Sequence, residues 1–137
     1  MPTPLKIVVF LGSVRNGRMG DRVAKYVQEN LEIKGMEPIM MDPLEMNVGQ
    51  VLQPLQFMKD AEKEAPEWMK TANVSIQQAD GFLVIASEYN CGIPPALSNL
   101  MDSFPPSSYK HRPCGLITYV WIEKKIFYCL KSFKQPN

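Results

Sequence analysis

The sequence predicts an α/β fold, an open parallel sheet with helices on both faces. Three observations predict it. Unbroken apolar runs at residues 7–11 and 82–86 are typical of strands that are covered on both faces. Segments with apolar residues at helical spacing alternate with such runs along the chain. A length of 137 residues suits one domain with a real core. We therefore expect three layers and right-handed crossovers.

The first half of the chain predicts a strand, a helix and a second strand. After the strand at 7–11, apolar residues recur at helical spacing as far as Leu31, and Lys34-Gly35 ends that helix. Residues 37–41 form a second strand. Residues 42–66 follow neither period and contain three prolines, so we expect a long loop with one helical turn. The methionines of this loop either pack against the body or line a pocket.

The second half repeats the alternation. Pro66 begins a helix that extends to Ala79, and Asp80-Gly81 breaks it before the strand at 82–86. A further helix follows Pro94 and Pro95 and buries residues as far as Phe104. Residues 114–120 then form a fourth strand.

A polar, glycine-rich loop follows the first strand and precedes the first helix. Backbone N–H groups at a helix start lack intrahelical partners and the helix dipole is positive there, so the loop suits a phosphate. Arg15 and Arg18 add guanidinium charges and Ser13 adds a hydroxyl. An ordinary strand-to-helix connection with solvated charges is the alternative. The candidate ligands are Gly12, Ser13, Arg15, Arg18, Met19 and Gly20.

The letters of this loop exclude two nucleotide motifs. Gly12 and Gly17 have the spacing of a triphosphate-binding loop, but Arg18 and Met19 stand where the lysine and the hydroxyl residue belong. The glycine spacing does not match the dinucleotide fingerprint either. A monophosphate site remains.

A second polar loop leaves the third strand. Ligands of open parallel sheets bind beyond the carboxyl ends of the strands, where the strand order reverses. With strand order 2-1-3-4, that point lies between the first and third strands, so both loops are expected to border one crevice. The candidates in this loop are Ser87, Glu88, Tyr89, Asn90 and Gly92.

These residues resemble the NADPH-dependent FMN reductases, a flavodoxin-like family that includes quinone, azo-dye and chromate reductases. The matching pieces are the run from Leu11 to Arg18, Asp80-Gly81, and the run from Glu88 to Asp102. The resemblance covers residues from about 5 to 120. It implies a flavodoxin-like three-layer sheet of order 2-1-3-4, FMN as cofactor, and NADPH or NADH as co-substrate.

The resemblance also implies roles. Ser13, Arg15 and the backbone of residues 18–20 would hold the FMN phosphate, and the second loop would lie along the isoalloxazine ring, mainly through backbone groups. Tyr89 would pack on the ring; a core or subunit-interface aromatic is the alternative. Glu88 is interpreted as ordering its loop, with no proton-transfer role. The cofactor carries the hydride, so we assign no catalytic side chain.

Composition narrows the remaining classes of function. A net charge of +1 indicates neither nucleic acid nor an anionic membrane as partner. Three cysteines at unpatterned spacing suggest no disulfide framework and no metal site. His111 is interpreted as a solvated loop residue and Cys91 as a small loop residue rather than a redox thiol. Without a signal peptide or membrane-spanning run, we expect a cytoplasmic protein. Its partner would be a small-molecule electron acceptor, and a family-type homodimer or tetramer stays open.

The end of the chain departs from the family pattern. We expect residues 1–120 to form an FMN-binding domain that is incomplete, and residues 121–137 to form a divergent tail with the family's fifth strand missing. Ile122, Ile126, Leu130 and Phe133 would share one face of a short helix. Alternatively, the fourth strand is an exposed edge.

Two functions are compatible with these residues. The first is an NAD(P)H-dependent flavin oxidoreductase that passes hydride through FMN to a quinone, an azo compound, a metal oxyanion or free flavin. The alternative is a truncated, non-catalytic flavodoxin-like protein that binds FMN weakly or not at all.

Overall fold

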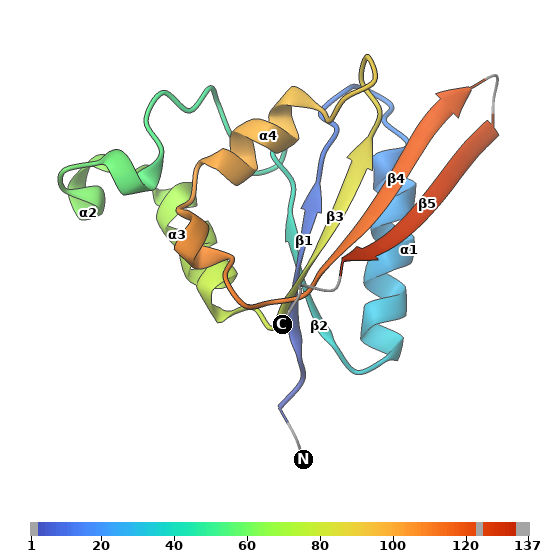
Figure 1. Cartoon of the computed structure of the whole chain (residues 1–137), viewed down its shortest axis with the longest axis horizontal. Helices are drawn as coiled ribbons and strands as arrows, with labels where there is room; N and C mark the ends of the chain where they lie inside the picture. Colours follow the sequence, from blue (N-terminus) through green and yellow to red (C-terminus); the bar gives the residue numbers. More distant parts are fainter. Residues whose placement is uncertain (1–2, 123–124, 134–137) are drawn as a thin grey trace.

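The computed structural model describes the backbone of residues 3–122 and 125–133 and the side chains of residues 3–120. Five strands and their connecting helices follow one another along the chain (Figure 1). In chain order they are β1 (Lys6–Leu11), α1 (Gly20–Ile33), β2 (Glu37–Met41), η1 (Leu55–Phe57), α2 (Ala61–Glu64), α3 (Glu67–Gln78), β3 (Gly81–Ser87), α4 (Pro95–Asp102), η2 (Pro106–Ser108), β4 (Cys114–Ile122) and β5 (Lys125–Phe133).

The sheet has the order β2-β1-β3-β4-β5, and its first four strands are parallel. This confirms the predicted flavodoxin-like order 2-1-3-4. Phe10 pairs with Val84 and Leu11 with Ile85, so β1 and β3 end at nearly the same level. The loops that follow these two strands therefore leave the same edge of the sheet side by side.

The tail differs from both expectations for it. Residues 125–133 form neither a helix nor a free segment beside a bare β4 edge. They form β5, which runs antiparallel to β4 from the pair Cys114–Phe133 to the pair Ile122–Lys125. Only two residues separate the two strands, and so short a connection permits antiparallel pairing alone. The aromatic and β-branched residues of the segment favour the extended conformation.

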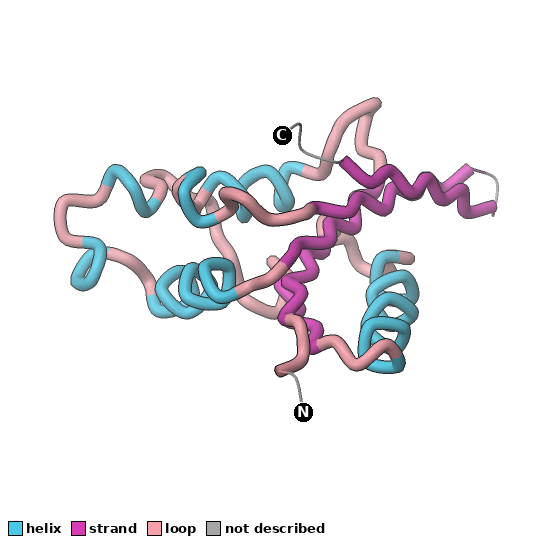
Figure 2. The backbone as a smooth tube through the Cα atoms, turned by 60° about the horizontal axis from the view of Figure 1, so that its bottom comes forward, coloured by secondary structure: helices cyan, strands magenta, loops and turns pink. Residues whose placement is uncertain are grey.

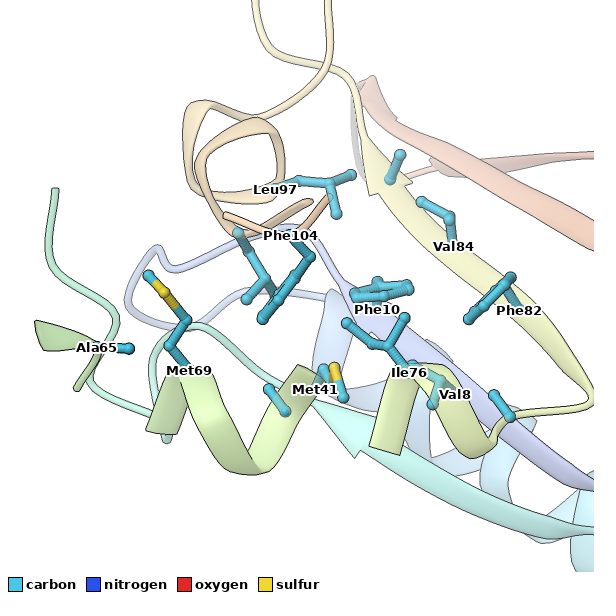
Figure 3. Close-up of a cluster of buried hydrophobic side chains, with 14 residues drawn as sticks. Val8, Phe10, Met41, Ala65, Met69, Ile76, Phe82, Val84, Leu97 and Phe104 are labelled. Atoms are coloured by element: carbon cyan, nitrogen blue, oxygen red, sulfur yellow. The ribbon is translucent and has the colours of Figure 1, made fainter. Parts of the chain in front are cut away.

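Helices cover both faces of the sheet, as predicted (Figure 2). α1 lies on one face, and α3 and α4 lie on the other (Figure 1). Val8 and Phe10 face the larger core on the α3 and α4 side, drawn in Figure 3, whereas Val9 and Leu11 face the smaller core under α1. Burial on both faces explains why β1 shows no polar alternation. In the described part of the chain, no helix has the length and apolar character needed to cross a membrane.

The long loop after β2 packs against the body. Met46 and Met58 contact the larger core, as the packing interpretation of the loop methionines predicted. Asn99 of α4 fixes the loop at two points. Its side-chain oxygen accepts the Val51 N–H at 3.0 Å, and its amide nitrogen donates to the Gly49 carbonyl at 2.9 Å. The loop is thereby joined to the helix that follows the second polar loop.

We expect Tyr109 to make the stability of the protein sensitive to alkali. Its hydroxyl donates to the Met101 carbonyl at 2.9 Å, and burial raises its pKa, with a smaller contribution from the Asp102 charge. The folded state thus favours the neutral phenol, and the free energy of unfolding falls as pH rises above about 10, where an unfolded tyrosine ionises.

Tyr109→Phe removes this titration. Between about pH 9 and about pH 11, the free energy of unfolding of the variant should therefore fall less than that of the wild type in urea unfolding experiments. Tyr26→Phe, at an exposed position on α1, is the control and should follow the wild type. Equal losses in Tyr109→Phe and the wild type would contradict this account.

Candidate functional site

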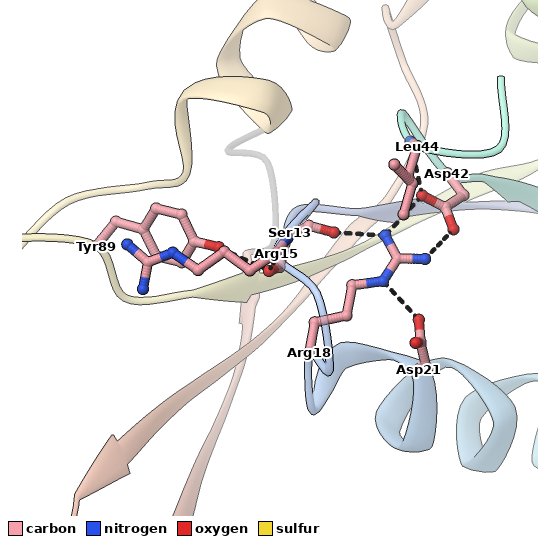
Figure 4. A network of polar contacts seen from close by, with 7 residues as sticks. All are labelled: Ser13, Arg15, Arg18, Asp21, Asp42, Leu44 and Tyr89. Atoms are coloured by element: carbon pink, nitrogen blue, oxygen red, sulfur yellow. Dashed lines mark hydrogen bonds and ion pairs between the residues drawn. The ribbon is translucent and has the colours of Figure 1, made fainter. Parts of the chain in front are cut away.

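The loops that follow β1 and β3 meet at the carboxyl edge of the sheet. The Gly12 N–H donates to the Ile85 carbonyl at 2.9 Å, which extends the pairing of the two strands by one residue. The Ser13 and Tyr89 hydroxyls are hydrogen-bonded at 2.6 Å (Figure 4). The structure therefore brings the two predicted loops together.

The first loop turns tightly before α1. The Arg18 N–H donates to the Arg15 carbonyl at 3.2 Å, and Gly17 has φ +66°, a conformation that side chains disfavour. Among the described residues, no side chain caps the start of α1 at Gly20. The Arg22 and Val23 N–H groups donate to the Met19 carbonyl, so the N–H groups left at the helix start are those of Gly20 and Asp21, at the positive end of the helix dipole.

The guanidinium of Arg15 lies against Tyr89 beside the crevice. Its guanidinium carbon lies 3.7 Å from the centre of the Tyr89 ring, a cation–π contact between the two loops (Figure 4). Within the described residues, Arg15 has no carboxylate partner. Its positive charge is thus not compensated by an ion pair.

Arg18 has different partners from those expected. Its guanidinium donates to the Ser13 carbonyl at 2.5 Å, to both carboxylate oxygens of Asp42 and to Asp21 at 2.6 Å (Figure 4). The contact of Arg18 with a phosphate stays a prediction, but the sequence did not predict this pairing with two carboxylates. The reason is that the end of β2 places a buried carboxylate behind the loop, and a planar guanidinium pairs with a carboxylate through two parallel bonds.

The second loop is a tight hairpin. Tyr89 and Gly92 exchange both backbone hydrogen bonds, at 2.9 and 3.0 Å, and Asn90 and Cys91 between them have φ values of 50° and 60°. Two consecutive positive φ values define a type I′ turn. The Glu88 N–H donates to the Tyr119 carbonyl at 3.0 Å. Among residues 88–92, only Asn90 and Cys91 have backbone N–H groups left for a ligand.

Two adjoining cavities lie along the crevice. One, of about 260 Å³, lies between the first loop and the start of the second, and the other, of about 490 Å³, lies between the second loop and Thr118 of β4. Ser87 and Glu88 line both. The Ser87 hydroxyl is buried and has no hydrogen-bond partner of normal geometry in the described part of the chain. It lies close to the Tyr119 hydroxyl, and a polar ligand group at this position would satisfy it more fully.

Two residues of the site were not identified from the sequence. Asp42 is the buried partner of Arg18, and Tyr119 lines the smaller cavity from β4. Burial raises the pKa of Tyr119, although the nearby Ser87 hydroxyl lowers it. Both residues lie at the carboxyl edge of the parallel sheet, because Asp42 directly follows β2 and Tyr119 pairs with Ser87, the last residue of β3. That position is the signal that could have identified them, because ligand sites of such sheets form there.

His111 and Cys91 lie apart from the cavities or at their rim. His111 is exposed, has φ +61° and precedes the start of β4, at the opposite edge of the sheet. Its neighbour Arg112 packs over the Phe82 ring and donates to the Ile76 carbonyl. Cys91 is exposed at the tip of the type I′ turn and lines the larger cavity.

Comparison with known proteins agrees with this architecture. Residues 5–132 match the family model described as NADPH-dependent FMN reductase. The NAD(P)H-dependent FMN reductase ntnL of a Nectria species is 28% identical over 119 residues, covering 83% of this chain and 59% of that protein. The quinone reductase of Escherichia coli K12 is 29% identical over 108 residues, covering 74% and 51%. This chain therefore spans between half and three-fifths of the length of these relatives.

Solved structures show the same fold. FerB, a flavoenzyme NAD(P)H:(acceptor) oxidoreductase from Paracoccus denitrificans, superposes with a TM-score of 0.61 at 24% identity, covering 83% of this chain and 60% of that one. The apo form of an NADH:FMN oxidoreductase superposes with a TM-score of 0.59 at 16% identity, covering 80% and 55%. At these identities the likeness establishes the fold.

A substitution at Gly12 tests how closely the two loops approach each other. A Cβ atom at this position would lie 2.9 Å from the Ile85 carbonyl oxygen and 3.1 Å from Leu97 Cδ2. Because the backbone of β3 cannot yield, Gly12→Ala should lower the free energy of unfolding by about 1 to 3 kcal/mol, measured in urea. The control is Gly49→Ala, whose Cβ would meet no atom within 4 Å, and it should change stability by less than about 0.5 kcal/mol. Equal effects of the two substitutions would contradict the crowding.

Proposed function

Because the chain belongs to the NADPH-dependent FMN reductase family, whose cofactors are FMN and NAD(P)H, we propose that it binds FMN in the crevice between the β1 and β3 loops and acts as an NAD(P)H-dependent flavin oxidoreductase. The observation that carries the proposal is the junction of the two loops, with the Ser13 hydroxyl against the Tyr89 hydroxyl at 2.6 Å. The proposed site lies within residues 1–120.

The smaller cavity suits the phosphate. Ser13 offers a hydroxyl, Arg15 an uncompensated charge, and Met19 and Gly20 the N–H groups at the start of α1. A charged, bidentate donor above a helix N-terminus is a strong combination for a phosphate monoester. We therefore assign the phosphate to these four residues.

The larger cavity suits the flavin ring. It adjoins the smaller cavity through Ser87 and Glu88, and the two volumes together fall within the range of about 300 to 1,000 Å³ that is usual for small-molecule sites. The Ser87 hydroxyl and the N–H groups of Asn90 and Cys91 are available to polar atoms at the ring edge. Isolated hydroxyl and amide donors of this kind orient a largely apolar ligand.

The protein supplies position and electrostatics. When bound, FMN would supply the hydride-transfer chemistry between NAD(P)H and an oxidised acceptor. Glu88 is exposed at the opening of both cavities, and its carboxylate disfavours further negative charge beside it. We assign no general acid or base. The acceptor proposed is a quinone, an azo compound, a metal oxyanion or free flavin.

A specific contact supports the second candidate function. Tyr89 bridges the crevice, because its hydroxyl meets Ser13 and its ring lies against the Arg15 guanidinium. If these contacts persist, Ser13 and Arg15 stay bonded to Tyr89 instead of the phosphate, and the chain is a non-catalytic flavodoxin-like protein with weak FMN binding.

Retention of flavin separates the two candidates. After incubation with FMN and desalting, the purified full chain should keep a flavin absorption spectrum, and it should oxidise NADPH when a quinone is added. A folded, colourless protein without this activity would contradict the proposal and favour the second candidate. Circular dichroism of the same sample establishes that the chain is folded.

Arg15 should select for the phosphate. Arg15→Ala should raise the dissociation constant for FMN by about tenfold or more, since a charge-assisted contact to phosphate is lost. The constant for riboflavin, which has no phosphate, should change little. Arg22→Ala removes the same charge from an exposed site on α1 and serves as the control. Titrations followed by flavin fluorescence provide the measurement, and equal losses for FMN and riboflavin would contradict the assignment.

A further inference from the structure

Arg18 lines the smaller cavity, yet most of its N–H groups donate to partners within the protein. Four of its five N–H groups donate to Asp21, Asp42 and the Ser13 carbonyl. We propose that Arg18 is a positioning residue, held by Asp42, that keeps Ser13 and its loop in the phosphate-binding shape without contacting the phosphate. This inference rests on the proposed function and names the residues that preorganise its site.

The geometry makes Arg18 and Asp42 one unit. The two side chains are 6% and 8% exposed, and they meet through two parallel hydrogen bonds. The bond to Asp42 raises the pKa of Arg18, so the guanidinium stays charged. Removing one member of a buried pair leaves the other charge unsatisfied, which is far costlier than losing an exposed pair.

The unit connects three segments of the chain. Arg18 Nη1 donates to the Ser13 carbonyl at 2.5 Å, and the hydroxyl of Ser13 is bonded to Tyr89 in the other loop. Asp42 Oδ1 also accepts the Leu44 N–H at 2.9 Å, at the turn after β2. A disturbance at Asp42 is therefore transmitted through Arg18 to the carbonyl of the serine that faces the crevice.

Asp42 is the informative position because it lines neither cavity. An effect of Asp42 on FMN must therefore be indirect, and Arg18 is the partner of Asp42 that lines the proposed phosphate site. If Arg18 were instead a direct phosphate ligand, loss of the Asp42 carboxylate would release its guanidinium toward the anion and leave binding unchanged or tighter. The two roles thus predict opposite outcomes for one substitution.

The test compares Asp42→Asn, Arg18→Lys and the double variant in the full chain. Lysine keeps the charge but cannot form the two-pronged bond. FMN and riboflavin titrations followed by flavin fluorescence should show an FMN affinity that falls about tenfold in each single variant, with riboflavin changed less than about twofold. The FMN affinity of the double variant should be about that of the weaker-binding single variant, because both substitutions act on one interaction. Asp60→Asn, at the residue that precedes α2, removes the same charge and serves as the control.

Three results would overturn the inference. One is unchanged or tighter FMN binding in Asp42→Asn. Another is full FMN affinity in Arg18→Lys, which would mean that charge alone suffices. The third is a lower thermal unfolding midpoint with an unaltered ratio of FMN to riboflavin affinities, because a purely structural pair would lower stability without changing phosphate selectivity.

Amide hydrogen exchange on the FMN-free chain separates this inference from the proposed function. Asp42→Asn should speed exchange at residues 13–20 by about tenfold, while Asp60→Asn leaves these amides unchanged. If the wild type binds no FMN, the proposed function fails together with the phosphate part of the inference, and the exchange rates alone decide whether Asp42 holds the loop. Unaltered exchange at residues 13–20 would overturn that part too.

Discussion

The parallel pairing of β1 with β3 is the constraint on which the crevice depends. Both strands are buried on both faces, so a shift by one residue would move every side chain of β1 into the wrong core. The pairing continues beyond the strands through the Gly12 N–H and the Ile85 carbonyl. The closeness of the two polar loops is therefore a property of the sheet, and the loops themselves supply only the chemistry of the site.

A second constraint is the charge inside the first loop. Arg15 and Arg18 both line the smaller cavity, where two uncompensated guanidinium groups would repel each other. Arg18 is compensated by two carboxylates, whereas Arg15 lies on the Tyr89 ring and has no ion pair among the described residues. In the proposed site, Arg18 would shape the loop and Arg15 would provide its net attraction for phosphate.

Most of the fold followed from apolar periodicity and from glycine and proline punctuation, because buried parallel strands have few alternative interpretations. The polar partners did not follow. Arg18 and Asp42 are 24 residues apart, and Asp42 before a proline is typical of a turn residue. The helix predicted in the tail was wrong for a related reason. Its apolar spacing fits one helical face, but the two-residue connection after β4 favours a strand paired with β4. Both outcomes depend on three-dimensional neighbours that local patterns do not contain.

We propose that one FMN molecule contacts both the β1 loop and the β3 loop. Amide chemical shifts measured by NMR during an FMN titration of the full chain test it directly. The account predicts that amides of residues 12–20 and 88–92 shift together with one dissociation constant, and that riboflavin moves mainly the second group. Shifts confined to one loop, or two groups that saturate at different FMN concentrations, would contradict it.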